Sequence, residues 1–375
     1  MKPTPLPTQS PPLVDRVLDL ACAVQQVPAP TFAEAERASW LRKQLLAEGL
    51  QQVEIDPAGN VLACLPGRTP GRTLVVSAHL DTVFSPTTDL SLTRTAEHIA
   101  GPGIGDNSLG IAGLMGLVWM LRERKNQLPG DLWLAATTGE EGLGNLKGIT
   151  AVVERFGAAP LAYLIVEGIG LGEVYHRGLP IQRYRIEVDT PGGHSWTDFG
   201  RPSAVHELAG LVARLAALPV PRNPRTSLNV GVFYGGTTVN TLAAHAWAEV
   251  DLRSVSSDVV KKFGAQLCQA ANEMNRADVR CQAMLIGQRP AGEIPARHPL
   301  VQLAVRCLEE QGIQPHTGIG STDANAPLSC GYPAVCIGLT TGSGAHTLDE
   351  FIRTRPLAKG LEQLFSLAVR VWDLA

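Results

Sequence analysis

The chain has 375 residues, of which 45% are hydrophobic and 18% are charged. This length exceeds that of most single domains and the apolar fraction suffices for real hydrophobic cores, so we expect a globular protein of two domains. The formal net charge of −3 and the lack of a run rich in Lys or Arg argue against nucleic acid as a partner and favour a small molecule or a peptide.

The first 65 residues predict a leader, two helices and a hairpin. Residues 1–12 are rich in proline and have no apolar core, which is typical of a disordered leader and not of a signal peptide. Apolar residues then recur at three-to-four spacing in 13–27 and 32–50, so we expect two amphipathic helices. Residues 53–65, VEIDPAGNVLACL, have the pattern of a β-hairpin.

Strands and helices alternate along the next part of the chain. This alternation implies an α/β layer built on a mainly parallel sheet. The predicted strands are 73–81, 131–138, 161–168 and 332–338, and the predicted helices are 109–124, 149–156 and 300–311.

The pattern changes between about residue 179 and Arg289. There the segment 181–190 alternates polar and apolar residues, and the elements follow in the order βαββαβ, as in a small ferredoxin-like unit with a half-exposed sheet. The expected fold class is therefore α/β with an inserted ferredoxin-like α+β domain. The predicted boundaries are 1–178 and 289–375 for the two parts of the larger domain and 179–288 for the insertion.

The cysteines and the apolar runs favour a cytoplasmic location. The seven cysteines are odd in number, scattered and without a CxxC pair, so we expect buried thiols in a reducing compartment. The longest apolar run, 111–121, is too short to span a membrane, so we expect no membrane partner.

The tripeptide Gly139-Glu140-Glu141 follows the strand predicted at 131–138 and is the first candidate for chemistry. Successive side chains of an extended segment point to opposite faces, so the two carboxylates would address different targets. One of them could bind a metal while the other handles a proton. Taken alone, a solvated acidic turn is the simpler interpretation, and other residues have to decide.

Two further segments carry polar side chains in suitable places. His79 and Asp81 lie two apart in SAHLDTV, the spacing of a metal ligand and a carboxylate that orients its ring, although a hydrogen-bonded surface histidine has the same pattern. Asp106 lies in the glycine-rich loop GPGIGDNSLG before an apolar helix. There it can approach a ligand or, like Ser108, cap the helix.

Sites in open α/β sheets gather at the carboxyl ends of the strands. Glu167 ends the strand predicted at 161–168, and His346 follows a strand and a glycine-rich turn, so both can join His79 there. Carboxylates and imidazoles without a thiolate suit a hydrolytic zinc or related divalent site, and two metals need a bridging carboxylate, for which Asp106 is the natural choice. The glycine-rich loop fails the GxGxxG pattern of dinucleotide binding, and the chain offers no GxSxG for a covalent serine mechanism.

Together, the motifs HLDTV, GDNSLG, GEE, GGHSW and GAHT resemble those of the M20 family of metallopeptidases, which includes carboxypeptidase G2-like, peptidase T-like and succinyl-diaminopimelate desuccinylase-like enzymes. The resemblance covers nearly the whole chain from about Leu18. It implies a zinc-peptidase catalytic domain with two divalent metal ions, zinc first and Co²⁺ or Mn²⁺ as alternatives. It also implies that the inserted domain is a lid that joins two subunits into a homodimer.

The resemblance further implies roles for single residues. The implied metal ligands are His79 and Glu167 on one ion, Glu141 and His346 on the other, and Asp106 as the bridge. Glu140 would be the general base, and Asp81 would orient His79. His194, in GGHSW, would polarise the scissile carbonyl, in many family dimers from the partner subunit.

Longer stretches of family-like sequence add residues expected to contact the substrate. These are Asn240, Arg253, Arg177, Gly320, Ser321 and Thr322. A salt-bridged strand arginine is the plain alternative for Arg253. The expected reaction is hydrolysis of an amide bond in a small peptide by a water molecule that two zinc ions activate. An N-acyl amino acid deacylase with the same centre is the alternative, and a metal-free binding protein that keeps the fold is a third.

Overall fold

The computed structural model describes residues 12–374 and divides into two compact units. Among the described residues, unit 1 comprises 12–178 and 292–374, and unit 2 comprises Leu179–Ala291. Strand β14 (Arg280–Arg289) belongs to unit 2, so the inserted unit ends three residues later than the expected boundary at 288. The leader predicted at 1–12 lies outside the described residues except for Pro12.

A mixed sheet forms the core of unit 1. Its strands are β1 (Gln51–Ile55), β2 (Val61–Leu65), β3 (Thr73–His79), β6 (Asp131–Thr137), β7 (Pro160–Ile169), β8 (Glu173–Gly178), β15 (Gly292–Glu293), β16 (His316–Gly320) and β17 (Ala334–Thr340). Within residues 12–374 their order is β1-β2-β6-β3-β7-β17-β8-β15, with β16 paired to β8. The central strands β6, β3, β7 and β17 are parallel, as predicted, and β1 and β2 form the predicted hairpin.

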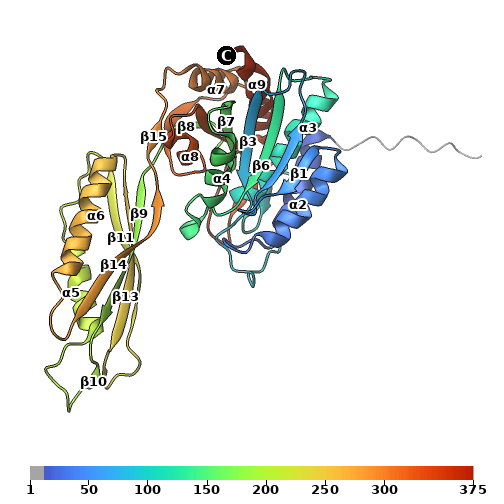
Figure 1. Ribbon diagram of the computed structural model, residues 1–375. Coiled ribbons are helices and arrows are strands. Elements are labelled where there is room, and N and C mark those ends of the chain that lie inside the picture. The colour runs from blue at the N-terminus through green and yellow to red at the C-terminus, as the bar shows by residue number, and fades with distance from the viewer. Residues whose placement is uncertain (1–11, 375) are drawn as a thin grey trace, which may run out of the picture. The chain divides into compact units, whose positions relative to one another are not determined.

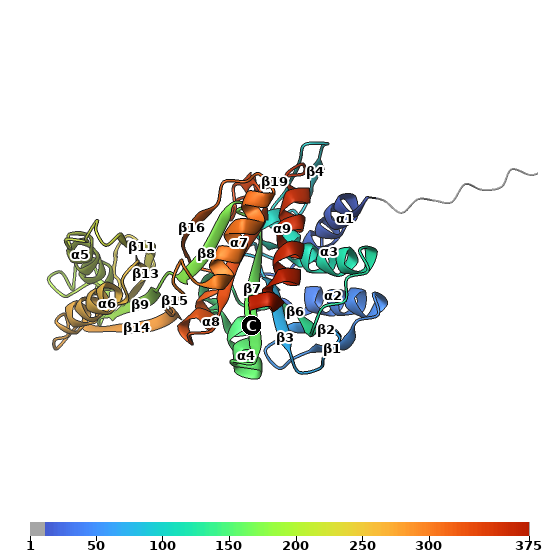
Figure 2. The ribbon, with the colours of Figure 1, turned by 90° about the horizontal axis from the view of Figure 1, so that it is seen from above.

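Helices cover this sheet (Figures 1 and 2). They are α1 (Leu13–Gln25), α2 (Ala35–Ala47), α3 (Gly110–Glu123), α4 (Lys147–Phe156), α7 (Pro299–Glu310), α8 (Asn325–Ser329), α9 (Leu357–Arg370) and the short turns Gly142–Gly144 and Val371–Leu374. α3 packs against β3 and β7, and α9 packs against β17 and α3. Because helices shield the central strands, β3 and β17 are buried along their whole length, which explains their continuous apolar sequences.

One helical stretch of the described chain, Ile104–Glu123, is long and apolar enough to cross a membrane by length and composition. However, 94% of its most apolar window is buried inside the fold. The stretch contains α3, and its burial is that of a core helix.

A second, small sheet in unit 1 joins segments that are far apart in sequence. Its strands are β4 (Thr93–Arg94), β5 (His98–Ala100), β18 (Gly342–Ser343) and β19 (Phe351–Arg353), in the order β18-β19-β5-β4. The pairing of β19 with β5 brings the late GAHT segment beside the glycine-rich loop that follows β5. These strands are only two or three residues long, and the sequence pattern did not predict them.

Unit 2 has the predicted βαββαβ order. Its elements are β9 (Ile181–Asp189), α5 (Ala204–Ala216), β11 (Thr226–Gly235), β13 (His245–Ser254), α6 (Ser257–Asn272) and β14, with a small ribbon of β10 (Gly193–His194) and β12 (Thr241–Leu242). The sheet order β11-β13-β9-β14 is antiparallel throughout and places the first and third strands at the centre, as in ferredoxin-like folds. Residues along β9 and β13 alternate between buried and half-exposed, because the helices cover one face only.

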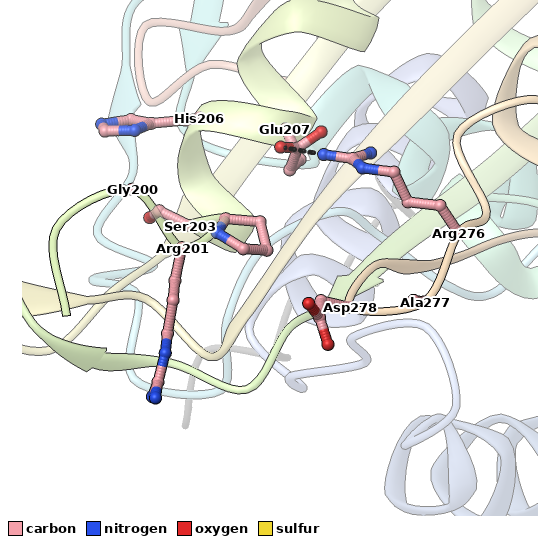
Figure 3. A pocket seen from close by; sticks show the side chains of 9 residues that line it. Gly200, Arg201, Ser203, His206, Glu207, Arg276, Ala277 and Asp278 are labelled. Atoms are coloured by element: carbon pink, nitrogen blue, oxygen red, sulfur yellow. Dashed lines mark hydrogen bonds and ion pairs between the residues drawn. The ribbon is translucent and has the colours of Figure 1, made fainter.

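Unit 2 also carries a hollow of about 440 Å³ beside the start of α5 (Figure 3). It is lined by Gly200, Arg201, Pro202, Ser203, His206, Glu207, Arg276, Ala277 and Asp278. Three of these lining residues are engaged in ion pairs: Arg276 pairs with Glu207 at 2.7 Å, and Arg201 pairs with Asp198 at 3.1 Å. None of the residues predicted for the site is among those that line it.

All seven cysteines are free thiols. The expectation that they are buried is wrong for Cys330, which lies at the end of α8 and is exposed, and Cys22 and Cys268 are half-buried. Burial raises the pKa of the Cys64, Cys281 and Cys307 thiols to about 11. The cytoplasmic location stays a prediction.

Candidate metal centre

The carboxyl ends of three parallel strands bring polar side chains to one edge of the sheet in unit 1. His79 is the last residue of β3 and pairs with Thr137, two residues before Gly139. Ser77 of β3 pairs with Ile165 of β7, and the residues two positions further along the two strands are His79 and Glu167. Gly139 has a φ of 66°, a left-handed conformation that favours glycine, and it turns the chain after β6 so that the two glutamates follow at this edge.

Asp106 lies between two imidazole rings. Its Oδ1 is 3.0 Å from His79 Nε2, and its Oδ2 is 3.1 Å from His346 Nε2. Each of these nitrogens also faces a second carboxylate. His79 Nε2 is 3.5 Å from Glu167 Oε2, and His346 Nε2 is 2.9 Å from Glu141 Oε1. The five side chains predicted as metal ligands thus form one continuous series of contacts with Asp106 at its centre.

Asn107, the residue after Asp106, makes the local hydrogen bonds at the start of α3, which leaves the Asp106 carboxylate free to face the two imidazoles. Asn107 Oδ1 accepts hydrogen bonds from the N–H of Gly110 (3.1 Å), at the start of α3, and from the N–H of Gly168 (2.9 Å). The peptide bond between Asp106 and Asn107 is cis, and Asp106 has extended backbone angles (φ −111°, ψ 88°). The side chain that accepts an N–H at the start of α3 is thus that of Asn107, so neither Asp106 nor Ser108 acts as the cap.

His346 reaches the centre from a tight turn. Its φ of 67° is in the left-handed region, which costs a residue with a side chain roughly 1–2 kcal/mol. The turn is held by Thr347, whose N–H and hydroxyl both donate to the carbonyl of Gly344, at 2.9 and 2.7 Å. Strain of this kind persists where the surroundings fix it and is frequent at functional sites.

The charges of the site shift its pKa values strongly. Hydrogen bonds to Asp106 and Glu141 raise the pKa of His346 to about 10. Burial lowers the pKa of His79, but the charge of Glu167 and hydrogen bonds to neighbouring carboxylates outweigh it and hold that pKa well above its usual range. Burial alone would raise the pKa of Asp106, but the two histidines hold it well below its usual range. The edge of the sheet is thus a region of strong negative potential.

Glu167 titrates differently from Asp106. Burial raises the pKa of Glu167 to about 7, with a further contribution from the charge of Asp106, while His79 acts in the opposite direction. The carboxylates outnumber the imidazoles, and a protonated carboxyl is one way in which the site relieves their repulsion.

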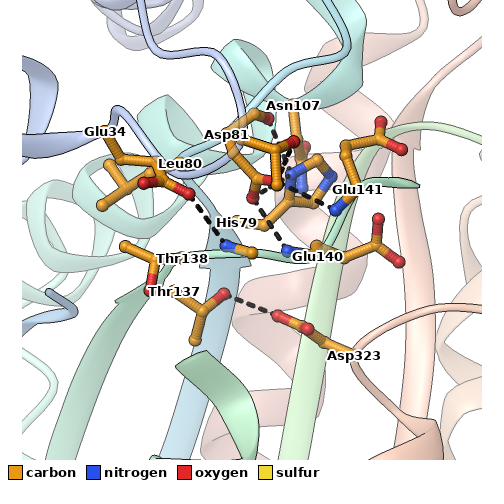
Figure 4. Close-up of polar contacts among 12 residues, drawn as sticks. Glu34, His79, Leu80, Asp81, Asn107, Thr137, Thr138, Glu140, Glu141 and Asp323 are labelled. Carbon is orange, nitrogen blue, oxygen red and sulfur yellow. Dashed lines mark hydrogen bonds and ion pairs between the residues drawn. The ribbon is translucent and has the colours of Figure 1, made fainter. Parts of the chain in front are cut away.

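Asp81 links His79 to the acidic tripeptide (Figure 4). Its two carboxylate oxygens accept the N–H groups of Glu140 and Glu141, each at 2.9 Å. The shorter contact to the His79 ring comes from the backbone carbonyl of Asp81, 3.0 Å from Nδ1, whereas its Oδ1 is 3.6 Å away. Asp81 therefore orients both the ring and the loop that carries the glutamates, the latter through its carboxylate.

The donor set fits divalent metal ions. Among the described residues, ligand atoms of His79, Asp106 and Glu141 all lie within 4.8 Å of one another. Imidazole and carboxylate donors without a thiolate are typical ligands of zinc and related divalent ions. The carboxylates that would attract a metal ion also raise the pKa values of the two imidazoles, because they favour positive charge at this place.

Comparison with known proteins decides the family. Residues 75–370 match the model of Peptidase family M20/M25/M40, which is most of the chain. The chain belongs to the M20 family. YqjE of Bacillus subtilis (strain 168) is 23% identical over 374 residues, covering 94% of this chain and 97% of YqjE. As an M20 chain, the protein is a hydrolytic enzyme of the peptidase and amidohydrolase kind.

Two solved M20-like structures share the fold. Aminopeptidase PepT from Bacillus cereus ATCC 10987 has a TM-score of 0.75 and 23% identity, covering 96% of this chain and 99% of that one. YXEP of Bacillus subtilis, described as a dinuclear metal-binding M20 peptidase, has a TM-score of 0.67 and 16% identity, covering 97% and 99%. The mixed α/β fold with its mainly parallel central sheet is therefore that of M20 peptidases.

Two residues that the M20 resemblance adds lie together in unit 2. His194 is in β10 and is exposed, and the next residue, Ser195, donates its N–H to the carbonyl of Asn240 at 3.0 Å. His194 Nδ1 accepts the N–H groups of Trp196 (3.2 Å) and Thr197 (3.4 Å). This leaves the proton of the neutral ring on Nε2.

The two predicted arginines are both paired with carboxylates. Arg253 contacts both oxygens of Asp251, at 2.6 and 3.2 Å, so the salt-bridge alternative describes its present state. Arg177 Nε is 2.8 Å from Glu293 Oε2. A substrate carboxylate would have to replace or share these partners.

Gly320, Ser321 and Thr322 follow one another at the end of β16. A side chain at Gly320 would meet the ring of Tyr175 at 2.8 Å, so this position requires glycine for packing. The N–H of Thr322 donates to Asn325 Oδ1 at 3.1 Å and the Thr322 hydroxyl accepts the N–H of Ala324, which fixes the turn before α8. These contacts explain the local sequence without a substrate.

The sequence reasoning missed several buried residues that hold the ligand-bearing loops. Glu34 Oε1 accepts the N–H of Gly139 at 3.1 Å, and Arg37 donates to the carbonyl of Leu80 at 2.7 Å. Glu350 accepts backbone N–H groups of the Asp106 loop, and burial raises its pKa to about 7. Glu350 lies four residues after His346 in the segment TLDE, and this nearness to a predicted ligand was the available signal, although it does not indicate which loop the carboxylate meets.

Proposed function

We propose that the protein is a two-metal amide hydrolase that cleaves small peptides, with Glu140 as the general base. The observation that carries this proposal is the position of Asp106, whose two oxygens each face one imidazole. A carboxylate used in this way is what a pair of metal ions needs as a bridge. The name of YXEP, a dinuclear metal-binding peptidase, supports two ions in this chain as well.

We propose zinc as the metal, with Co²⁺ and Mn²⁺ as alternatives, because the donors are two imidazoles and three carboxylates. His79 and Glu167 would hold one ion, His346 and Glu141 the other, and Asp106 both. When bound, such a pair supplies Lewis-acid activation of an amide carbonyl and of water.

Glu140 and Glu141 have separate tasks in this proposal. Glu141 contacts His346, and Figure 4 shows the Glu140 carboxylate as a separate group on the same side of the tripeptide. The N–H of Glu140 is fixed by Asp81, which sets the origin of its side chain. Glu140 would accept the proton of the attacking water and pass it to the nitrogen of the leaving amine.

His194 is suited to stabilise the negative oxygen that develops on the attacked carbonyl. Because its Nδ1 accepts two backbone N–H groups, its Nε2–H is the donor that remains. A donor directed at the developing oxyanion stabilises the transition state more than the substrate.

The geometry of unit 2 supports an active site in which the His194 that contacts the substrate belongs to a second subunit. His245 and Arg253 stand at opposite ends of β13, eight positions apart, which is about 27 Å at 3.4 Å per residue. His194 lies near the His245 end, since Thr190 pairs with Ala244, whereas Arg253 pairs with Ile181, close to the joint with unit 1. An extended tripeptide spans only about 10 Å. One small substrate cannot reach both residues of a single copy.

Strand β11 supports the homodimer. It is an edge strand of the sheet in unit 2 and exposes the consecutive apolar residues Val232, Phe233 and Tyr234. An unpaired edge with apolar side chains is a surface that proteins usually cover. We propose that a second copy of this chain covers it.

Peptides are the favoured substrate class, because PepT and YXEP are both named as peptidases. An N-acyl amino acid differs from a dipeptide only in the group on the acyl side, so the same centre can serve deacylation. The free carboxylate common to both substrates is the group that Arg177 or Arg253 would bind.

Two measurements on the purified wild-type protein test the proposal. Metal analysis after purification without chelators should find two divalent ions per chain, and a protein that binds no divalent metal would contradict it. Di- and tripeptides should then be hydrolysed faster than N-acetyl and N-succinyl amino acids. The reverse order would replace peptidase by deacylase and leave the metal centre intact.

A further inference from the structure

Glu350 lies beneath the loop that carries Asp106, and its carboxylate is completely buried. Glu350 Oε1 accepts the N–H groups of Gly105 and Asp106, both at 2.7 Å, and Oε2 accepts the N–H of Gly103 at 2.8 Å. Three hydrogen bonds of this length to one carboxylate are charge-assisted and roughly twice as strong as neutral ones.

The loop requires this support because its own sequence leaves it without regular structure. Gly103 has a φ of 74°, and Asp106 is extended, so the N–H groups of Gly103, Gly105 and Asp106 converge on the Glu350 carboxylate and are not used in a helical ladder. Converging backbone N–H groups form a cavity that favours an anion. Here the anion is a side chain of the protein, 244 to 247 residues further along the chain.

The segment that supplies Glu350 also supplies His346. The backbone carbonyl of Glu350 accepts the N–H of Gly101 at 2.8 Å, and the N–H of Glu350 donates to the carbonyl of Thr347 at 3.3 Å. The Asp106 loop and the His346 turn are therefore connected through Glu350 at both its main chain and its side chain. This connection fixes the position of Asp106 relative to His346.

We propose that Glu350 is a positioning residue for the metal centre, which holds the loop so that Asp106 lies between both imidazoles. The inference rests on the proposed two-metal function. Because Asp106 faces both rings, a shift of its loop should weaken the binding of both ions and not of one only. Replacement of a residue that orients a metal ligand typically lowers metal affinity roughly 10- to 100-fold.

The test uses Glu350→Gln, which has nearly the same volume but only one acceptor oxygen. Its amide group would place a donor against a backbone N–H, so that at least one of the three hydrogen bonds is lost. The matched control is Asp349→Asn, which removes the same charge from the exposed neighbouring residue. Glu350→Asp keeps both oxygens but is one methylene shorter, and it should show an intermediate effect.

Zn²⁺ is titrated into the chelator-treated proteins by calorimetry, and the unfolding midpoint of each metal-free protein is recorded beside it. We expect two ions in the wild type and in Asp349→Asn, and an affinity roughly 10- to 100-fold lower for both ions in Glu350→Gln. Affinities in Glu350→Gln equal to those of the wild type would overturn the inference, even with a lower unfolding midpoint, because Glu350 would then serve stability alone. If Glu350→Gln does not fold, Glu350→Asp decides by the same criterion. A wild type that binds no Zn²⁺ would instead overturn the proposed function, on which the inference rests.

Discussion

Replacement of Asp81 by asparagine tests whether one carboxylate organises both His79 and the acidic tripeptide. Its oxygens accept the N–H groups of Glu140 and Glu141 separately, and the hydroxyl of Thr31 donates to Oδ2 at 2.9 Å. Asparagine has one acceptor oxygen, so one of the two N–H groups would face an NH₂ group. The loss of one hydrogen bond to a charged group costs about 1.5–3 kcal/mol. For a domain of this size that lowers the unfolding midpoint by roughly 3–12 °C.

The same change should disturb the metal centre. Since Glu140 and Glu141 start from the N–H groups that Asp81 holds, we expect metal affinity to fall roughly 10- to 100-fold in Asp81→Asn. Thr31→Val is the control, because it removes one hydroxyl and leaves both N–H groups with their acceptors. Calorimetric unfolding without metal and Zn²⁺ titration measure the two effects. An Asp81→Asn variant with wild-type stability and wild-type affinity would refute the role given to this carboxylate.

Two further predictions concern the dimer and the acid stability of unit 1. Phe233→Lys, on the exposed edge strand β11, should convert the dimer into a monomer, as measured by analytical ultracentrifugation. The control Gln282→Lys, on the opposite edge strand β14, should stay dimeric. A dimeric Phe233→Lys variant would contradict an interface at β11. Burial lowers the pKa of His298, whose Nδ1 accepts the N–H of Leu300 at the start of α7. The His298 ring therefore binds its second proton more tightly in the unfolded chain than in the folded one. Its contribution is therefore complete above a pH of about 6.5 and declines as the pH falls below it, and His298→Ser should make urea unfolding less dependent on pH between 5 and 7.5. An unchanged pH dependence would contradict this account.

The positions of the metal-ligand candidates could be predicted because they follow from short patterns. An apolar run that ends in a polar residue predicts a buried strand and its carboxyl end, and three such ends fell beside one another in the sheet. His79 and Glu167 were predicted in this way, from β3 and β7. The ferredoxin-like order of unit 2 was likewise visible, because alternation marks a sheet with one covered face.

The contacts that hold these residues could not be predicted from spacing. Glu350 meets the Asp106 loop through pairing of the short strands β5 and β19, and Glu34 meets Gly139 across 105 positions. Such contacts depend on which distant segment the fold brings near, and no local period encodes this. Spacing also predicted that the Asp81 carboxylate would orient His79, but the closest approach to Nδ1 is made by the Asp81 carbonyl.

The arginines illustrate a different limit. A strand arginine that binds substrate and one that pairs with a neighbouring carboxylate have the same sequence pattern. In the structure, Arg253 contacts Asp251 two positions away in the same strand, and Arg177 contacts Glu293 of the adjacent strand β15. Which of the two roles operates during the reaction depends on the substrate, and it stays a prediction.

Metal content and turnover of a Glu140→Ala variant test the central claim most directly. The predicted metal ligands are untouched by this change, so the variant should bind two divalent ions per chain, as the wild type does. Hydrolysis of a small peptide should fall by about 10²- to 10⁴-fold, because the group that takes the proton from water is gone. A variant that keeps both its metal ions and its turnover would contradict the assignment of Glu140 as the general base.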